Sequence, residues 1–152
     1  MERLAHATRL EWDGSTGAGY RAYSREHRAS APPASAALRL SADPHFRGDG
    51  DLLNPEQLVV LAASSCQLLS FLSVAARKHL DVVGYSDDAT GYLSADLRKA
   101  RIETIELRPV IRVAAGTDEA LVHELVEQAH QECYIANSLH SEVTITTTVV
   151  TA

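Results

Sequence analysis

Residues Asn54 to Leu80, NPEQLVVLAASSCQLLSFLSVAARKHL, are the stretch that decides the fold, and Cys66 lies near the middle of it. Asn54 can cap a helix, Pro55 suits the first helical position, and Gln57 stands where the partner in a capping box would lie. The stretch therefore predicts a long helix that begins at Asn54.

The apolar side chains of this stretch go most of the way round the helical wheel. They are Leu58, Val59, Leu61, Ala62, Leu68, Leu69, Phe71, Leu72, Val74, Ala75 and Ala76. A helix that is apolar on nearly every side is surrounded by other protein. Serines and a glutamine interrupt it, and no uninterrupted apolar run approaches the roughly 18 residues that a membrane span needs. We therefore expect a core helix and no membrane association.

The chain has 152 residues, which fits a single domain over residues 1–152 with a sizeable core. The net charge of −6 argues against a nucleic-acid surface, because phosphate binding needs clustered Lys and Arg. The N-terminus, MERLAHATRLEWDG, lacks the apolar segment of a secretory signal. Two cysteines are too few for a secreted disulfide framework, so we expect a cytoplasmic protein.

Strand patterns precede the central helix. Residues 3–12 alternate loosely and end at a turn signal, and residues 19–30 resume the pattern, which predicts a hairpin. Residues 36–41 are a candidate third strand. A polar loop, residues 43–51, then leads into the helix.

Strands also dominate the sequence after the helix. Four segments have strand patterns: residues 82–85, 91–97, 102–114 and 143–150. In the third of these, Pro109 implies an edge position or a bulge. Thr117 or Asp118 caps a second helix that ends at about Glu132, and a short further helical turn is expected at residues 134–139.

This order of elements predicts an α+β fold in which antiparallel sheet covers the central helix. A helix that is apolar on nearly every side is hard to bury within 152 residues. A partner subunit could supply the missing cover, and a two-fold dimer is the commonest such arrangement.

The chain contains two cysteines, Cys66 and Cys133, which lie 67 positions apart (133 − 66). Free cysteines are among the most buried residue types, so both could be plain core residues. The serines around Cys66 and the presence of one further cysteine favour a functional pair. Both interpretations are open at this point.

Several motifs, in the same order along the chain, resemble the OsmC/Ohr family of thiol-dependent hydroperoxide reductases. NPEQL at residues 54–58 followed by Cys66, with Glu56 ten residues before the cysteine (66 − 56), is similar to that family's signature. AHQECYIANS at residues 129–138 resembles its resolving-cysteine segment. Three further segments resemble a subgroup of OsmC-like proteins: YSREH at 23–27, FRGD at 46–49 and YSDDATG at 85–91.

The resemblance implies antiparallel sheets wrapped around a long central helix, and a catalytic cycle without a cofactor. In that cycle Cys66 attacks the peroxide and becomes a sulfenic acid, and Cys133 condenses with it to a disulfide. A dithiol reductant, such as a lipoylated protein, then restores both thiols. Leu69, Phe71 and Ile135 would line an apolar pocket that suits a small organic hydroperoxide better than hydrogen peroxide.

A buried thiol stays protonated near neutral pH unless a cation lies beside it, because burial disfavours the thiolate. The resemblance implies an arginine in that role, held by Glu56. Arg47 lies nearly where the OsmC branch has its arginine, and Arg25 is nearer the position used in the Ohr branch. We favour Arg47.

Glu56 cannot reach Cys66 of its own helix directly. Ten residues put the two about 15 Å apart along a straight helix and about 80° apart around it. Either an arginine spans part of that gap, or the glutamate of one subunit serves the cysteine of the other. This mismatch predicts a homodimer with both sites at the interface.

Two positions depart from the family's pattern. Tyr134 follows Cys133 where proline is common, and Gln67 follows Cys66 where an aromatic residue or histidine is common. The first departure affects the geometry of the resolving step, and the second affects substrate preference.

Other functions were weighed on the same residues. Glu127, His130 and Cys133 have the helical spacing of zinc ligands, but no Cys-x-x-Cys or His-Glu-x-x-His pattern accompanies them, so no metal site is expected. No nucleotide-binding loop is present. The alternative to an enzyme is a non-catalytic module of the same fold that binds an apolar or lipoyl-like ligand.

Overall fold

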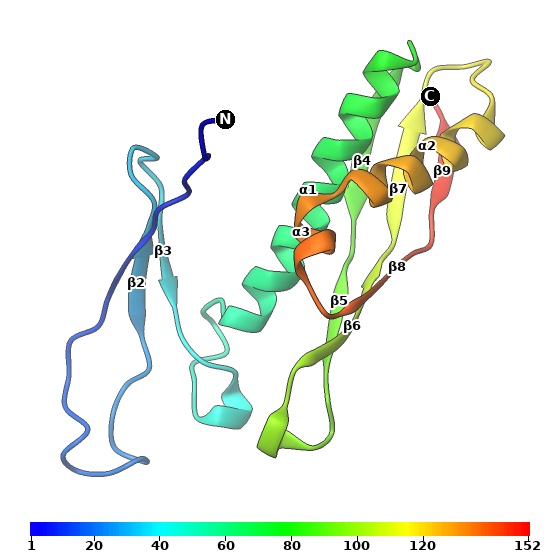
Figure 1. Ribbon diagram of the computed structural model, residues 1–152. Helices are drawn as coiled ribbons and strands as arrows, with labels where there is room; N and C mark the ends of the chain where they lie inside the picture. Colours follow the sequence, from blue (N-terminus) through cyan, green and yellow to red (C-terminus); the bar gives the residue numbers. More distant parts are fainter. The chain divides into compact units, whose positions relative to one another are not determined.

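The structure, a computed structural model, describes residues 1–152 and divides into two compact units. The first unit is Met1–Leu58 and the second is Val59–Ala152. Each has its own β-sheet structure (Figure 1). The α+β class predicted from the sequence is confirmed, whereas a single domain over residues 1–152 stays a prediction.

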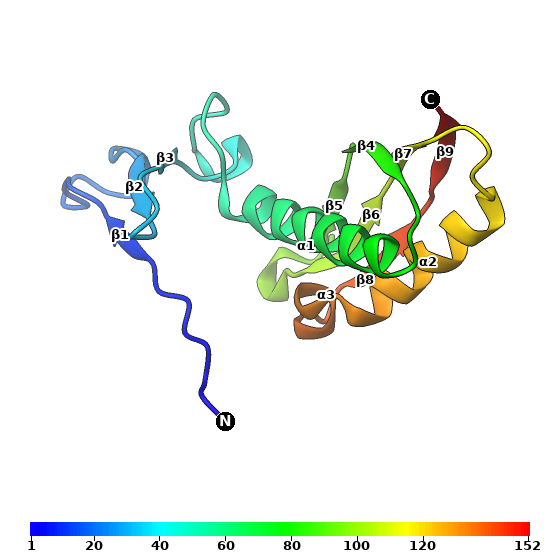
Figure 2. The ribbon, with the colours of Figure 1, turned by 90° about the horizontal axis from the view of Figure 1, so that it is seen from above.

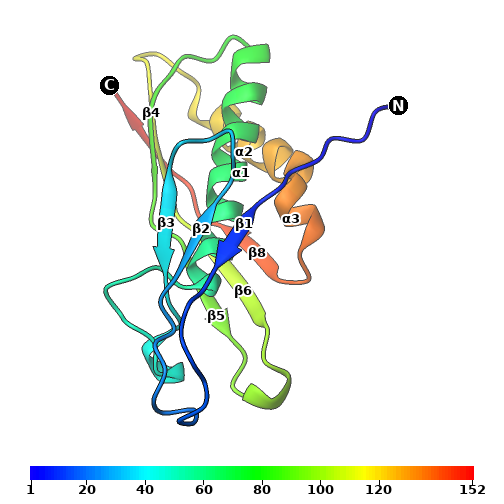
Figure 3. The same cartoon turned by 90° about the vertical axis from the view of Figure 1, so that its left-hand side faces the viewer.

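The first unit contains an antiparallel sheet of three strands in the order β1-β2-β3 (Figure 3). The strands are β1 Arg9–Glu11, β2 His27–Ser30 and β3 Ala37–Leu40. The predicted hairpin and third strand are confirmed. A short 3₁₀ helix, η1 (Pro44–Phe46), lies in the predicted polar loop.

Residues 19–26 were predicted as strand and are instead part of a loop. Side chains of the loop satisfy its backbone in place of a strand ladder. The indole of Trp12 donates to the Ser24 carbonyl at 2.9 Å, and Arg25 donates to the carbonyls of Tyr20 and Tyr23 at 2.6 and 2.7 Å.

The central helix α1 (Pro55–Arg77) begins where the sequence predicts. The Gln57 amide N–H donates to the Asn54 side chain at 2.9 Å, and the Asn54 N–H donates to the Gln57 side chain at 3.0 Å, which is a reciprocal capping box. At the other end, His79 has a positive φ of 56° and Leu80 N–H donates to the Ala75 carbonyl. This is a Schellman ending, and Leu80 is buried beneath it.

Within this chain, only one face of α1 is buried. Its buried residues are Ala63, Gln67, Phe71, Val74 and Ala75, whereas Leu61, Leu69 and Leu72 are 57%, 64% and 39% exposed. By length and composition α1 could cross a membrane, a property that core helices of soluble proteins share. The structure therefore leaves an apolar stripe of α1 uncovered.

The second unit contains two three-stranded sheets, in the orders β4-β7-β9 and β5-β6-β8. The strands are β4 Val82–Asp87, β5 Thr90–Leu93, β6 Ile102–Leu107, β7 Pro109–Val113, β8 Glu142–Ile145 and β9 Thr148–Thr151, with a 3₁₀ helix η2 at Leu97–Lys99. The pairs β4–β7 and β5–β6 are antiparallel, and the pairs β6–β8 and β7–β9 are parallel. The sheets are thus mixed, where the sequence predicted antiparallel pairing.

Two segments predicted as single strands are each divided in two. Residues 102–114 break at Arg108, because its N–H donates to the Asp87 carboxylate at 2.6 Å and not to a neighbouring strand. Residues 143–150 also break, into β8 and β9, because the first part pairs with β6 and the second with β7. Thr146, between the two strands, still donates its N–H to the Leu107 carbonyl of β6 at 2.9 Å. Pro109 lies on the central strand β7, and its pairing with Asp87 is regular, so both predicted alternatives, an edge position and a bulge, are wrong. Proline is tolerated here as the first residue of the strand.

Two helices complete the second unit: α2 (Glu119–Glu132), capped by Asp118, and α3 (Tyr134–Ser138). Both α1 and α2 lie against the β4-β7-β9 sheet (Figures 1 and 2). The core between them is made of Phe71, Val74, Ala75, Leu80, Ile111, Val113, Val122, Leu125, Val126 and Ala129. This core fixes where α2 ends relative to the middle of α1.

Candidate functional site

The second unit brings the two cysteines together. Cys66 is half-buried in the middle of α1, and Cys133 is buried at the junction where α2 ends and α3 begins. Both are free thiols, and the Cys66 thiol lies near enough to raise the pKa of Cys133. Residues that lie 67 positions apart in the sequence (133 − 66) are therefore neighbours in the fold.

The surroundings of Cys133 hold it as a neutral thiol. Burial raises the pKa of Cys133, and the adjacent Cys66 thiol raises that pKa further. The backbone N–H groups of Ala136 and Ile135 act in the opposite direction, because they can stabilise the thiolate. Cys133 is thus protonated near neutral pH, yet donors for its thiolate are already in place.

Asp87 links the turn between β4 and β5 to α1. Ser64 Oγ, two residues before Cys66, donates to one Asp87 carboxylate oxygen at 2.5 Å, and the other oxygen accepts the Arg108 N–H. Sequence reasoning did not identify this contact. The resemblance of residues 85–91 to OsmC-like proteins was the only signal for it.

The apolar residues predicted to line a pocket do not share one environment. Phe71 is fully buried in the core against α2, because it lies one helical turn after Gln67 on the inner face of α1. Leu69 is largely exposed on the other face, and Ile135 packs partly buried in a second cluster with Ile105. Phe71 is therefore a core residue, and the prediction that it lines a pocket is wrong.

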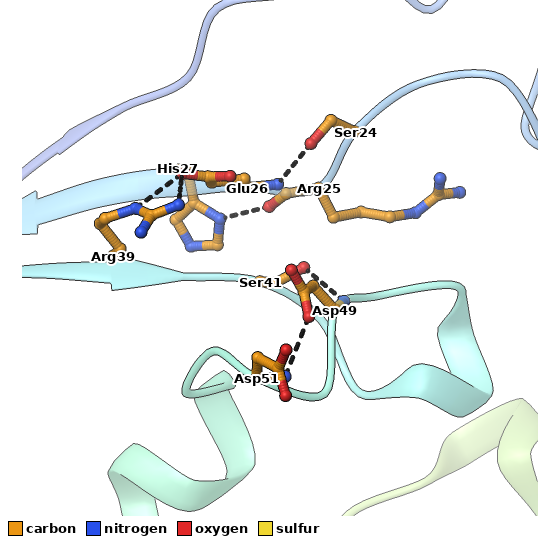
Figure 4. Close-up of polar contacts among 8 residues, drawn as sticks. All are labelled: Ser24, Arg25, Glu26, His27, Arg39, Ser41, Asp49 and Asp51. Carbon is orange, nitrogen blue, oxygen red and sulfur yellow. Dashed lines mark hydrogen bonds and ion pairs between the residues drawn. The ribbon is translucent and has the colours of Figure 1, made fainter.

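Arg25 is held within the loop of the first unit. Its guanidinium donates to the carbonyls of Tyr20 and Tyr23 and lies over both rings, 4.6 Å and 3.9 Å from their centroids. Figure 4 shows the side chain extending away from the Glu26–Arg39 ion pair. The cation of Arg25 is thus already engaged by its own loop.

Arg47 makes none of the contacts that engage Arg25. It is exposed, ends η1 with a positive φ of 65°, and its side chain makes no hydrogen bond or ion pair within the chain. The following Gly48 packs so tightly that an added Cβ would lie 1.6 Å from the Ala42 carbonyl oxygen. The loop that carries Arg47 is further held by the Asp49 N–H, which donates to the Ser41 hydroxyl at 3.0 Å (Figure 4).

Glu56 is half-buried in the first turn of α1. Together with Arg25 and Arg47 it belongs to the first unit, whereas both cysteines belong to the second. The structure brings the two cysteines together within the second unit.

The first unit also contains an open pocket of about 370 Å³, a size typical of small-molecule sites. Its lining is mainly apolar and aromatic and includes Leu10, Trp12, Tyr23, Arg25, His27 and Pro55. Sequence reasoning did not predict this pocket, because its lining comes from several short segments that lie far apart in the sequence.

Comparison with known proteins gives consistent relatives. The family model described as OsmC-like protein matches residues 48–148. An organic hydroperoxide resistance protein from Xanthomonas axonopodis pv. citri is 28% identical over 126 residues, which cover 82% of this chain and 87% of that protein.

Solved structures agree. An OsmC-like protein of unknown function from Vibrio cholerae is 28% identical, with a TM-score of 0.84 over 95% of this chain and 99% of that one. An organic hydroperoxide resistance protein from Elizabethkingia anophelis is 18% identical, with a TM-score of 0.72 over 100% of both chains. The second likeness concerns the fold alone.

The environment of the two thiols predicts unequal alkylation. Because Cys133 is buried and its pKa is raised, we expect iodoacetamide at pH 7 to modify Cys66 at least about tenfold faster than Cys133. The rate at Cys133 should keep rising with pH beyond about 8.5, the ordinary thiol pKa, because its thiolate forms only at higher pH. Mass spectrometry of the two peptides measures both rates, and equal rates at pH 7 would contradict the prediction.

Proposed function

The chain belongs to the OsmC-like protein family, and on that premise we propose that it is a thiol-dependent peroxidase that reduces organic hydroperoxides. The contact between Cys66 and Cys133 carries this proposal. A plain core would have no need to place the two cysteines of the chain against each other. Similarity to an organic hydroperoxide resistance protein supports the choice of substrate class.

The proposed cycle has three steps. The Cys66 thiolate attacks the O–O bond of a hydroperoxide, which gives a sulfenic acid and, after protonation of the leaving alkoxide, an alcohol. Cys133 then attacks the sulfenic sulfur, a disulfide forms, and the thiol proton leaves with the hydroxide as water. An external dithiol, such as a dihydrolipoyl group on a protein, reduces the disulfide and is itself oxidised.

Arg47 is the proposed cation for the Cys66 thiolate, with Glu56 orienting it. The engagement of Arg25 by two carbonyls and two tyrosine rings favours Arg47, whose side chain is free of such contacts. In this assignment Arg25 shapes the loop, and Arg47 supplies the charge.

A homodimer is proposed to cover the exposed face of α1 and to hold both sites at the interface. Leu61, Leu69 and Leu72 lie on one stripe of α1 and are exposed in the single chain. A contiguous apolar surface of this kind usually marks an interaction site. The dimer is proposed to act in the cytoplasm on small organic hydroperoxides.

A second candidate function is supported by the pocket of the first unit. Its aromatic and apolar lining, with the cation of Arg25 at its wall, suits an apolar or lipoyl-like ligand with an acidic end. In that case the protein would be a non-catalytic binding module. Thiol chemistry separates the two candidates.

Thiol counting tests the peroxidase. Reduced protein mixed with cumene hydroperoxide should lose two thiols per chain and gain a Cys66–Cys133 disulfide, which dihydrolipoamide should reduce faster than glutathione does. Cys66→Ser should abolish the reaction, and Cys133→Ser should allow one oxidation followed by over-oxidation. Unchanged thiols in the wild-type protein would rule out the peroxidase and leave the binding module.

Paired arginine variants test the proposed cation. Arg47→Ala should slow the attack of Cys66 on cumene hydroperoxide by about tenfold or more, the loss expected when a neighbouring charge no longer favours the thiolate. Arg25→Ala should change that rate less and should mainly loosen the loop, which thermal unfolding would reveal. Stopped-flow single-turnover rates measure the attack, and the opposite order of effects would reassign the role to Arg25.

A charge on the exposed stripe tests the dimer. Leu69→Glu should convert a dimer to a monomer in sedimentation experiments at micromolar concentration, because the stripe would then bury an unpaired carboxylate. Gln131→Glu, at an exposed position of α2 and therefore off the stripe, is the control and should remain a dimer. A monomeric wild-type protein that is fully active would refute the proposed interface.

A further inference from the structure

Gln67 is a buried polar residue on the otherwise apolar inner face of α1. It is only 1% exposed, and its Nε2 donates to the Val126 carbonyl of α2 at 3.2 Å. A buried amide destabilises a core unless it is hydrogen-bonded, so an apolar residue would be the simpler choice for packing. The amide instead joins the helix that carries Cys66 to the helix that ends at Cys133.

Two further buried polar atoms belong to residues of these two helices. Gln67 Oε1 and His130 Nδ1 both lack a hydrogen-bond partner. His130 follows Val126 by one turn of α2, so the two residues share a face of that helix. A proton on Nδ1 would make His130 a donor, and a water placed between Nδ1 and Gln67 Oε1 would give both atoms a partner.

The position of α2 along α1 decides whether a disulfide can form. A disulfide requires Cα atoms within about 4.4–6.8 Å of each other, and a slip of one helical residue moves a side chain by about 1.5 Å. Cys133 is tied to α2 through its N–H, which donates to the His130 carbonyl at 3.2 Å. Any shift of α2 at Val126 or His130 therefore moves Cys133.

The other polar link between the two helices is weaker. Arg77 forms an ion pair with Glu132 at 3.0 Å, but the side chains are 55% and 46% exposed. Exposed ion pairs contribute little because water and salt screen them. The buried amide is the link that can hold α2 in register.

We propose that Gln67, completed by His130, is a positioning residue for disulfide formation: it holds α2 in register on α1 so that Cys133 meets Cys66. The proposal rests on the proposed function for its place in a catalytic cycle. The contact itself can be tested without any hydroperoxide, so the two can fail separately.

The test is the thiol–disulfide equilibrium of the Cys66–Cys133 pair in buffers of reduced and oxidised dithiothreitol. Gln67→Met keeps the side-chain volume and removes the amide, and it should make the disulfide about tenfold easier to reduce, equal to about 30 mV. Gln67→Asn keeps an amide that is too short to reach Val126 and should shift the equilibrium in the same direction. Val150→Met, at an exposed position of β9, should change it less than about twofold.

The outcomes distinguish a positioning role of Gln67 from a role in core packing alone. If Gln67→Met and Gln67→Asn melt at lower temperature but keep the wild-type disulfide equilibrium, Gln67 only fills the core and the proposal is overturned. A wild-type pair that forms no disulfide at any dithiothreitol ratio overturns it as well. His130→Phe added to Gln67→Met should cause little further loss, and additive losses would remove His130 from the proposal.

Discussion

The packing of the inner face of α1 against β7 and α2 is the interaction on which the rest of the structure depends. Phe71, Val74 and Ala75 are buried there against Ile111 of β7 and Leu125 of α2. Burial of such side chains contributes about 1.5–3 kcal/mol each and has no direction of its own. The apolar contact therefore holds the helices together, and the role proposed for the Gln67 hydrogen bond to Val126 is to set their register.

The two faces of α1 lie in different environments. Its inner face fills a core within the chain, and its outer face, with Leu61, Leu69 and Leu72, is apolar but uncovered. Cys66 is half-buried between these faces. A reactive thiol needs shelter from water and access for a substrate, and a position between a core and a subunit interface would offer both.

Local features of the fold could be predicted from the sequence, and features set by distant residues could not. The capping box of Asn54 and Gln57 involves residues three apart, so the start of α1 is visible in the sequence. The break at Arg108 depends on the Asp87 carboxylate, 21 residues away. The apolar alternation of the sequence continues across Arg108, so it does not reveal the break. The division of residues 143–150 also depends on distant residues, since each half pairs with a different strand.

Some features of the candidate site could likewise be predicted from the sequence, and others could not. Motifs pointed to both cysteines, but no pattern in the sequence shows that Arg25 is engaged by Tyr20 and Tyr23, or that Gln67 faces α2.

In the proposed cycle, the two neighbouring thiols need opposite ionisation states. Cys66 must ionise to attack, whereas Cys133 should keep its proton until the sulfenic acid forms, because that proton leaves with the hydroxide as water. Burial raises the pKa of Cys133 and so meets this second need. The N–H groups of Ile135 and Ala136 then stabilise the thiolate at the moment of attack. A buried resolving thiol at the start of a short helix is therefore both protected and prepared for its reaction.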